Sequence, residues 1–345
     1  MRANLIFSPQ PKLLKYLEAR ENGFIIEVFK WVTNANAWFR DVDSEFERYF
    51  VYWFKSPPNT LKLAIGTALE TGYRLIDCAF VYSNEKEIGD ALEEYMKKLN
   101  LKREDIFITS KCWCTYMRPE LVRKCCERSL SDLKLSYLDL YLIHWPVPLK
   151  PGDVNFPNSA DGKNLDIDKV PLLDTWEAME KLVDEGLVKS IGLSNFNRRQ
   201  IDLIINNGRI RPVNLQVEIH ANFPNTKLVN YAHSVGLTVT AYAPLGSPAA
   251  SPGAANLLTE PWVCDIAMRH KKTPGQVLLR YLIQRNLAVV PKSVTPARIV
   301  ENSQIFDFHL SDEEMQVLNT KGLNRRQFQL LGMKLSEEYP FSDEF

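Results

Sequence analysis

The stretch GYRLIDCAFVYSNEKEIGDAL, residues 72–92, contains a short apolar run that ends on Asp77 and is followed by a helix-forming segment from Glu85 onward. The apolar run predicts a buried strand over 74–77. A carboxylate at the end of a buried strand is costly to desolvate unless another group pairs with it. The sequence therefore predicts that a different strand supplies a partner for Asp77.

The alternation of strand and helix repeats along the chain. Further apolar runs of strand type lie at 106–111, 138–144, 190–194, 213–216, 238–242 and 288–291, and segments with helical spacing lie at 119–135, 172–185 and 274–284. Strands joined by helical crossovers predict a parallel sheet. A first strand near 49–54 would bring the number to eight. We therefore expect an α/β protein with a (β/α)8 TIM barrel. An open doubly wound sheet would instead favour a GxGxxG turn, which the sequence lacks.

Composition excludes several classes of function. The chain has 345 residues and a formal net charge of zero, so no overall attraction to nucleic acid or to an anionic membrane is expected. Six cysteines without zinc-ligand spacing predict reduced thiols and no metal site. The sequence shows neither a membrane span nor a signal peptide, which favours a cytoplasmic location.

Polar residues stand at the ends of six predicted strands. They are Asp77, Lys111, His144, Ser194 with Asn195, Gln216 and Tyr242. A single one of these would be interpreted as a satisfied core polar group. Six in succession indicate a shared site, because catalytic groups of a barrel lie at the carboxyl ends of its strands.

These residue types predict a site that donates a proton to a carbonyl. Asp77 and Lys111 can form a buried ion pair, and Tyr82 lies in the loop just after Asp77. An ammonium beside a phenol favours the phenolate and makes the hydroxyl a better proton donor near neutral pH. His144 can hydrogen-bond the carbonyl oxygen. No side chain supplies a hydride, so a nicotinamide cofactor is implied.

A second cluster follows the last predicted strand. Lys292, Ser293, Thr295 and Arg298 precede or open a helix. Cations, hydroxyls and backbone amides at a helix N-terminus form an anion site, and a phosphate site after the final strands is common in barrels. A helix cap with two incidental cations explains the same residues equally well.

Together these residues resemble the aldo-keto reductases, in particular the aldose and aldehyde reductase branch. The resemblance extends from about residue 55 to the C-terminus and rests on GYRLIDCAFVYSNEKEIG, LDLYLIHWP, IGLSNF, AYAPLGSP and PKSVTPARIVEN. It implies NADPH-dependent reduction of aldehydes and ketones to alcohols by a monomer. Tyr82 would be the proton donor, tuned by Lys111 and Asp77, and His144 would orient the carbonyl.

The resemblance also implies the binding residues. The nicotinamide would be held by Ser194, Asn195 and Gln216, with Tyr242 stacked beneath it. The 2′-phosphate of NADPH would lie at Lys292, Ser293, Thr295 and Arg298, with Glu301 and Asn302 at the adenine. Leu245, Ser247 and Val294 complete the expected cofactor residues. Phe54, Trp113 and Trp145 would form walls of the substrate pocket.

The N-terminal part departs from the family pattern. Residues 1–50 do not resemble it, the barrel is expected over 51–320, and 321–345 would form a substrate-site tail. Large aromatic residues at 49–54 replace the glycines that the family places in its first strand. An alternative function therefore stays open, in which a catalytically impaired barrel keeps a cofactor-binding or structural role.

Overall fold

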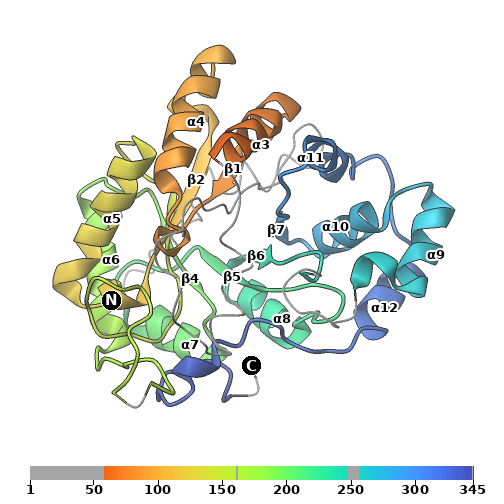
Figure 1. Ribbon diagram of the computed structural model, residues 1–345. Coiled ribbons are helices and arrows are strands. Elements are labelled where there is room, and N and C mark those ends of the chain that lie inside the picture. The colour runs from red at the N-terminus through yellow and green to blue at the C-terminus, as the bar shows by residue number, and fades with distance from the viewer. Residues whose placement is uncertain (1–57, 161, 248–255, 344) are drawn as a thin grey trace, which may run out of the picture.

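A computed structural model describes residues 58–160, 162–247, 256–343 and 345. Within them, seven parallel strands form one sheet in the order of the chain, β1 to β7 (Figure 1). The strands are β1 Leu75–Asp77, β2 Phe107–Cys112, β3 Leu140–Ile143, β4 Ile191–Ser194, β5 Asn214–Glu218, β6 Thr238–Tyr242 and β7 Ala288–Val290. All seven predicted strands are confirmed, with ends that differ by one or two residues. The predicted strand over 49–54, Phe54 and the segment 248–255 lie outside the described residues.

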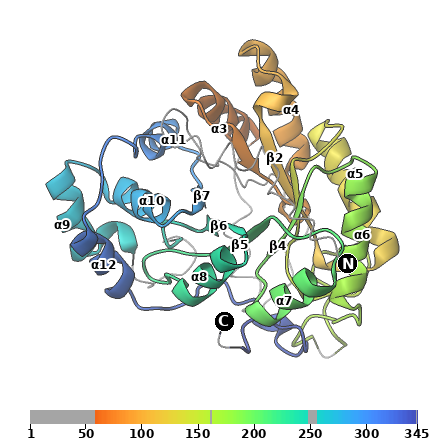
Figure 2. The same cartoon turned by 180° about the vertical axis from the view of Figure 1, so that it is seen from behind.

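Helices alternate with the strands and surround them, as Figures 1 and 2 show from opposite sides. The main ones are α3 Pro58–Thr71, α4 Glu85–Lys98, α5 Pro119–Leu133, α6 Leu172–Asp184, α7 Arg198–Asn207, α8 Thr226–Ser234, α9 Pro261–His270, α10 Pro274–Gln284, α11 Pro296–Ser303 and α12 Asp312–Thr320. The helices predicted at 119–135, 172–185 and 274–284 correspond to α5, α6 and α10, and the helix predicted from Glu85 onward corresponds to α4. The Thr273 side chain accepts from the backbone N–H of Gln276 and caps α10.

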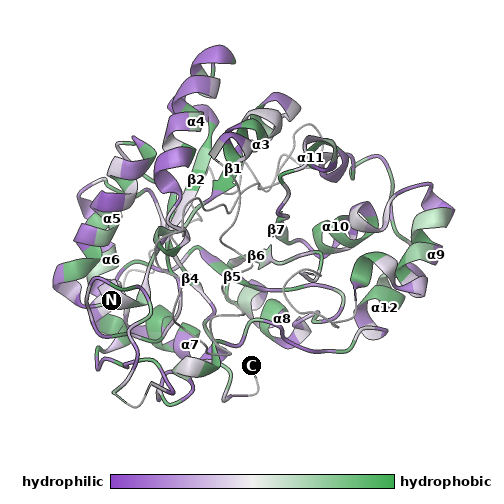
Figure 3. Ribbon diagram, viewed as in Figure 1, coloured by the Kyte–Doolittle hydropathy of each residue, from purple (hydrophilic) through white to green (hydrophobic). Residues whose placement is uncertain are grey.

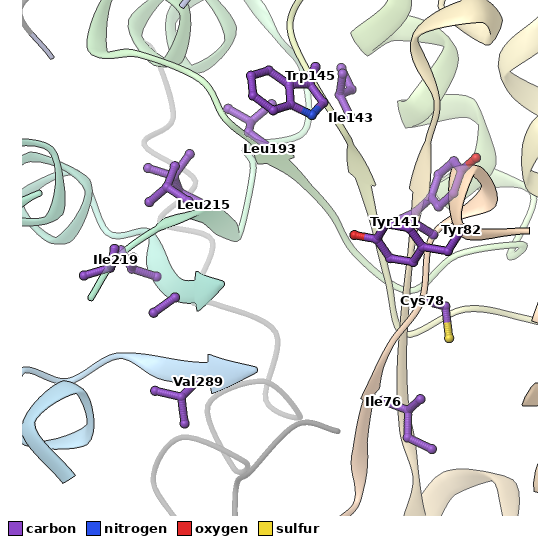
Figure 4. Packing of buried hydrophobic residues seen from close by; sticks show 14 of the residues in the cluster. Ile76, Cys78, Tyr82, Tyr141, Ile143, Trp145, Leu193, Leu215, Ile219 and Val289 are labelled. Atoms are coloured by element: carbon purple, nitrogen blue, oxygen red, sulfur yellow. The ribbon is translucent and has the colours of Figure 1, made fainter. Parts of the chain in front are cut away.

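The outward faces of the strands pack against the helices and form the main core. Figure 4 shows Ile76, Leu193, Leu215 and Val289, which come from four different strands. Helices α4 and α5 turn hydrophilic residues to the outside, as the purple parts of their ribbons show in Figure 3. The parallel sheet is thus covered by helices, which accounts for the apolar runs that revealed its strands.

The inward faces of the strands change character along the barrel axis. Side chains two residues apart on a strand share a face. Leu75 therefore lies on the same face as Asp77, and Phe107 on the same face as Lys111. The apolar members of this face, Leu75, Phe107, Leu140 and Leu142, form a small cluster of their own. The interior is therefore apolar toward the amino ends of the strands and polar at their carboxyl ends.

The two ends of the seven-stranded sheet approach each other, because the helices beside them pack together. Helix α3 precedes β1, α11 follows β7, and the two helices are in contact. The hydroxyl of Tyr73 donates to the carbonyl of Ile299 at 2.8 Å. The described residues thus form a nearly closed barrel of the (β/α)8 type, and its carboxyl-end mouth gathers the polar strand ends.

Candidate active site

The ion pair predicted for Asp77 lies at the centre of the mouth. Lys111 Nζ is 2.5 Å from Asp77 Oδ1, and the two side chains are 0% and 1% exposed. The same ammonium donates to the carbonyl of Cys78 at 2.7 Å. Gln216 Nε2 donates to Asp77 Oδ1 at 2.9 Å. The carboxylate at the end of β1 is therefore compensated by β2 and β5, as its burial requires.

Tyr82 lies directly beside this pair. The short 3-10 helix η1, Phe80–Tyr82, carries it, and the left-handed Ser83, with φ of 52°, ends that turn before α4 begins. Lys111 Nζ is 5.4 Å from the centroid of the Tyr82 ring. An ammonium offers three N–H donors, and Asp77 and Cys78 take two of them. The ammonium is therefore held by two acceptors and lies next to the phenol ring.

His144 faces the same phenol from the end of β3. The centroids of the Tyr82 and His144 rings are 5.7 Å apart, and the rings are perpendicular at 89°. Trp113 packs edge-on against His144 with ring centroids 5.2 Å apart. The indole of Trp113 donates to the carbonyl of Asn155 at 2.7 Å, which fixes its ring. The two rings therefore hold the imidazole in place on two sides.

Ser194, Asn195 and Tyr242 form a hydrogen-bonded group next to Gln216. Asn195 Nδ2 donates to the His144 carbonyl at 2.9 Å and to Ser194 Oγ at 3.1 Å. The Tyr242 hydroxyl donates to Asn195 Oδ1 at 2.8 Å. Burial raises the pKa of Tyr242 well above its usual range, so the hydroxyl stays protonated. Asn195 is therefore largely occupied within the protein, whereas Ser194 keeps its hydroxyl proton for another acceptor.

The predicted anion cluster surrounds the start of α11. Ser293 Oγ accepts from the backbone N–H of Thr295 at 3.1 Å. Lys292 is exposed, yet partial desolvation of its ammonium by nearby protein atoms lowers its pKa to about 8. Arg298 is exposed on the first turn of the helix. Two cations and a hydroxyl are thus brought together at a helix N-terminus.

Of the other predicted cofactor residues, Glu301 has a partner within the protein. Glu301 Oε1 accepts from the Thr273 hydroxyl at 2.7 Å, which ties it to the start of α10. Asn302 is 5% exposed. Leu245, Ser247 and Val294 are half-buried, the first two in the loop after β6 and the third before α11. Trp145 is buried against Phe341 of the tail, with ring centroids 5.6 Å apart.

Residues 50–322 match the model of the Aldo/keto reductase family. The chain belongs to the aldo/keto reductase family. It is 51% identical over 277 residues to aldo-keto reductase family 1 member A1-A of Danio rerio, covering 79% of this chain and 85% of that protein. It is 45% identical over 284 residues to aldo-keto reductase family 1 member C1 of Homo sapiens, covering 81% and 88%.

A solved structure gives the same result. The aldose reductase from Schistosoma japonicum superposes with a TM-score of 0.80 and 64% sequence identity, covering 84% of this chain and 93% of that one. Membership of the family implies that the chain is an oxidoreductase that acts on carbonyl compounds. The described ranges contain no helix long and apolar enough to cross a membrane. They also contain no cluster of three or more residues suited to hold a metal ion.

The structure of this aldo/keto reductase also brings to the mouth a residue that the sequence did not reveal. Glu218 is the last residue of β5, fully buried, and accepts from the backbone amides of Gln327 and Phe328 in the tail at 2.7 and 2.9 Å. Phe328 lies edge-on to Tyr242, with ring centroids 5.8 Å apart. The signal for Glu218 was its spacing of two from Gln216, which places both residues on the inward face.

A second overlooked residue lies behind the ion pair. Glu85 begins α4, is 3% exposed and accepts from Ser110 Oγ at 2.6 Å and from Ser129 Oγ at 2.7 Å. Burial raises its pKa to about 7, although the two hydroxyls oppose the shift. Glu85 thus joins α4, β2 and α5 just behind the turn that carries Tyr82.

Proposed function

We propose that the chain is an NADPH-dependent reductase of aldehydes and ketones in which Tyr82 donates the proton. The observation that carries this proposal is the Lys111 ammonium, which lies between the Asp77 carboxylate, at 2.5 Å, and the Tyr82 ring, at 5.4 Å from its centroid. A cation beside a phenol favours the phenolate, so it promotes release of the proton. Asp77 pairs with the Lys111 ammonium and holds it in place.

The groups around Tyr82 suit a carbonyl that is becoming an alkoxide. His144 faces the phenol ring and can hydrogen-bond the carbonyl oxygen, which would then lie between the imidazole and the phenol. Preorganised donors of this kind stabilise the charge that develops in the transition state. Trp113 limits the movement of His144 and offers an apolar wall to the substrate, with Trp145 as a second wall.

The mouth has hydrogen-bonding groups that fit a nicotinamide carboxamide. The amide nitrogen of Gln216 donates to Asp77, and its amide oxygen can accept a hydrogen bond from a carboxamide N–H. Ser194 accepts from Asn195 and can donate its own proton to the carboxamide oxygen. Asn195 acts mainly by holding Ser194 and Tyr242 in position. The cofactor, when bound, supplies the hydride.

NADPH rather than NADH is proposed because of the cluster at α11. Positive charge and hydrogen-bond donors lie together at the position where the 2′-phosphate would bind, and they come from Lys292, Ser293, Thr295 and Arg298. Val294, Glu301 and Asn302 would border the adenosine, and Leu245 and Ser247 would border the diphosphate. NADH carries no 2′-phosphate and would leave the cations without an anion.

The remaining proposals concern the whole chain. We take 51–320 as the barrel, 321–345 as a tail at the substrate site and 1–50 as an atypical segment, in a cytoplasmic monomer that acts on small carbonyl compounds. The neutral net charge and the six free cysteines are consistent with this proposal. The residues that the structure describes offer nothing in favour of an impaired barrel, the alternative that the first strand had suggested.

Titration of the protein's intrinsic fluorescence with NADPH and NADH, followed by turnover of an aromatic aldehyde, tests this function. We expect saturable binding that is tighter for NADPH, together with oxidation of one NADPH for each alcohol formed. Binding without turnover would favour the impaired barrel, and absence of binding would contradict both functions.

A further inference from the structure

We propose that Glu218 is a positioning residue that anchors the tail segment 322–328 over the mouth and thereby sets which carbonyl substrates the enzyme accepts. The substrate half of this inference rests on the proposed function, whereas the anchor itself does not. Glu218 has a carboxylate that is 0% exposed and points to the same face of β5 as Gln216.

Both oxygens of this carboxylate are used. Oε1 accepts from the Gln327 amide at 2.7 Å and lies 2.9 Å from His220 Nε2, and Oε2 accepts from the Phe328 amide at 2.9 Å. Hydrogen bonds to a charged acceptor are stronger than neutral ones. A carboxylate with three such neighbours is suited to hold the tail and is poorly placed to exchange protons with a substrate.

The anchor is the end of a longer strip of contacts. The backbone amides of Leu323 and Arg325 donate to the side chain and the carbonyl of Asn222 at 3.3 and 2.7 Å. At Gly322 the tail passes so close that an added Cβ would collide with the Ala221 carbonyl. Residues 218–222 therefore form a docking strip that binds the tail mainly through its backbone.

Two contacts connect the anchored tail to the site. Phe328 packs edge-on against Tyr242, the proposed platform of the nicotinamide, with ring centroids 5.8 Å apart. Gln327 Nε2 donates to the Gly246 carbonyl at 2.7 Å, in the loop after β6. Anchoring by Glu218 thus fixes an aromatic ring against Tyr242 and ties the tail to the loop proposed to border the cofactor. Loss of the anchor would let this wall of the pocket move.

The test compares three variants of the full-length protein. Glu218→Gln keeps the size of the side chain but turns an NH2 group toward one of the two tail amides. Gly322→Ala disturbs the same strip from the tail side. Glu180→Gln is the matched control, because Glu180 is also buried and accepts a backbone amide, that of Ile210 at 2.8 Å, away from the tail.

Hydrogen exchange at the amides of Gln327 and Phe328 is the direct measure of the anchor. We expect both amides to exchange roughly tenfold faster or more in Glu218→Gln and in Gly322→Ala, since a hydrogen bond to a charged group is lost or displaced. They should exchange at the wild-type rate in Glu180→Gln. Wild-type protection in the two tail variants would overturn the anchor.

The second measurement tests whether the anchor affects substrate choice. For an aromatic and a short aliphatic aldehyde, we expect the ratio of their kcat/KM values to change by roughly fivefold or more in Glu218→Gln, mainly through KM. The Kd for NADPH should stay within about twofold of wild type. Faster exchange with an unchanged ratio would overturn the role in substrate choice. If the wild-type protein had no reductase activity, both the proposed function and the role of Glu218 in substrate choice would be overturned. Hydrogen exchange at the two tail amides would still show whether Glu218 anchors the tail.

Discussion

Lys111 Nζ lies 2.5 Å from Asp77 Oδ1, and both side chains are buried at the carboxyl ends of neighbouring strands. The parallel pairing of β1 with β2 places the two groups side by side, and Gln216 adds a third contact from β5. The pair therefore has two consequences. It determines the electrostatics around Tyr82, and it makes the stability of the barrel depend on both charges being present together.

The first prediction follows from this dependence. Lys111→Met should lower the free energy of unfolding by about 3–5 kcal/mol, because it leaves a buried carboxylate without a cation. Lys111→Met combined with Asp77→Asn should recover most of that loss, although neither variant should retain normal turnover. Urea denaturation of the three proteins measures the effect. Equal destabilisation in the single and the double variant would show that the pair is not coupled in this way.

The second prediction concerns cofactor choice. Arg298→Ala removes an exposed cation from the first turn of α11 and should weaken NADPH binding by roughly tenfold, with little change for NADH. Fluorescence titration with the two cofactors measures both constants. Arg280→Ala, on the neighbouring α10, serves as the control for loss of a cation. If Arg298→Ala weakened both cofactors equally, the cluster would not recognise the 2′-phosphate.

The third prediction uses the pKa of Lys292, which desolvation lowers to about 8. As pH rises through about 8, Lys292 loses its proton and NADPH affinity should fall, while NADH affinity stays nearly constant. Below about pH 6 the phosphate itself becomes less charged, so NADPH affinity should fall there as well. Lys292→Met should abolish the decrease on the alkaline side. Parallel pH profiles for NADPH and NADH would contradict this assignment.

The fourth prediction concerns Glu85, because burial raises the pKa of its carboxyl from 4.5 to about 7. Between these values the folded protein binds more protons at this carboxyl than the unfolded chain does. Its contribution to stability is therefore complete below the unfolded pKa and is lost as pH rises to about 7. The change is on the order of 3 kcal/mol.

Glu85→Gln stays neutral throughout and provides the comparison. Urea denaturation at about pH 5 and about pH 8 should show that wild type loses more stability than the variant on going to the higher pH. An identical pH dependence in both proteins would mean that Glu85 stays ionised in the folded state.

The sequence predicted the barrel well, because each strand is covered by helices and therefore reads as an apolar run. It also predicted the partner of Asp77, since a buried carboxylate requires a cation and Lys111 ends the next strand. The role of Glu218 was not predicted. Its partners are backbone amides more than a hundred residues further along, and backbone amides leave no signal in the amino-acid sequence.

Asn195 shows a second limit. Its position after β4 correctly indicated the mouth, but sequence alone did not reveal that its side chain is engaged by His144, Ser194 and Tyr242. An amide can bind a ligand or organise its neighbours, and only the geometry distinguishes the two. The same holds for Glu301, whose carboxylate contacts Thr273. The first strand, predicted over 49–54, stays a prediction.

The most direct test of the account is a single-turnover measurement of NADPH oxidation with an aromatic aldehyde, made on wild type and Tyr82→Phe under identical conditions. Loss of a general acid typically costs about 10²–10⁴-fold. We therefore predict that wild type oxidises one NADPH for each alcohol formed, and that Tyr82→Phe does so at least about 100-fold more slowly with an NADPH Kd within about twofold of wild type. Near-wild-type turnover in Tyr82→Phe, or a wild type that binds NADPH without oxidising it, would contradict the central claim.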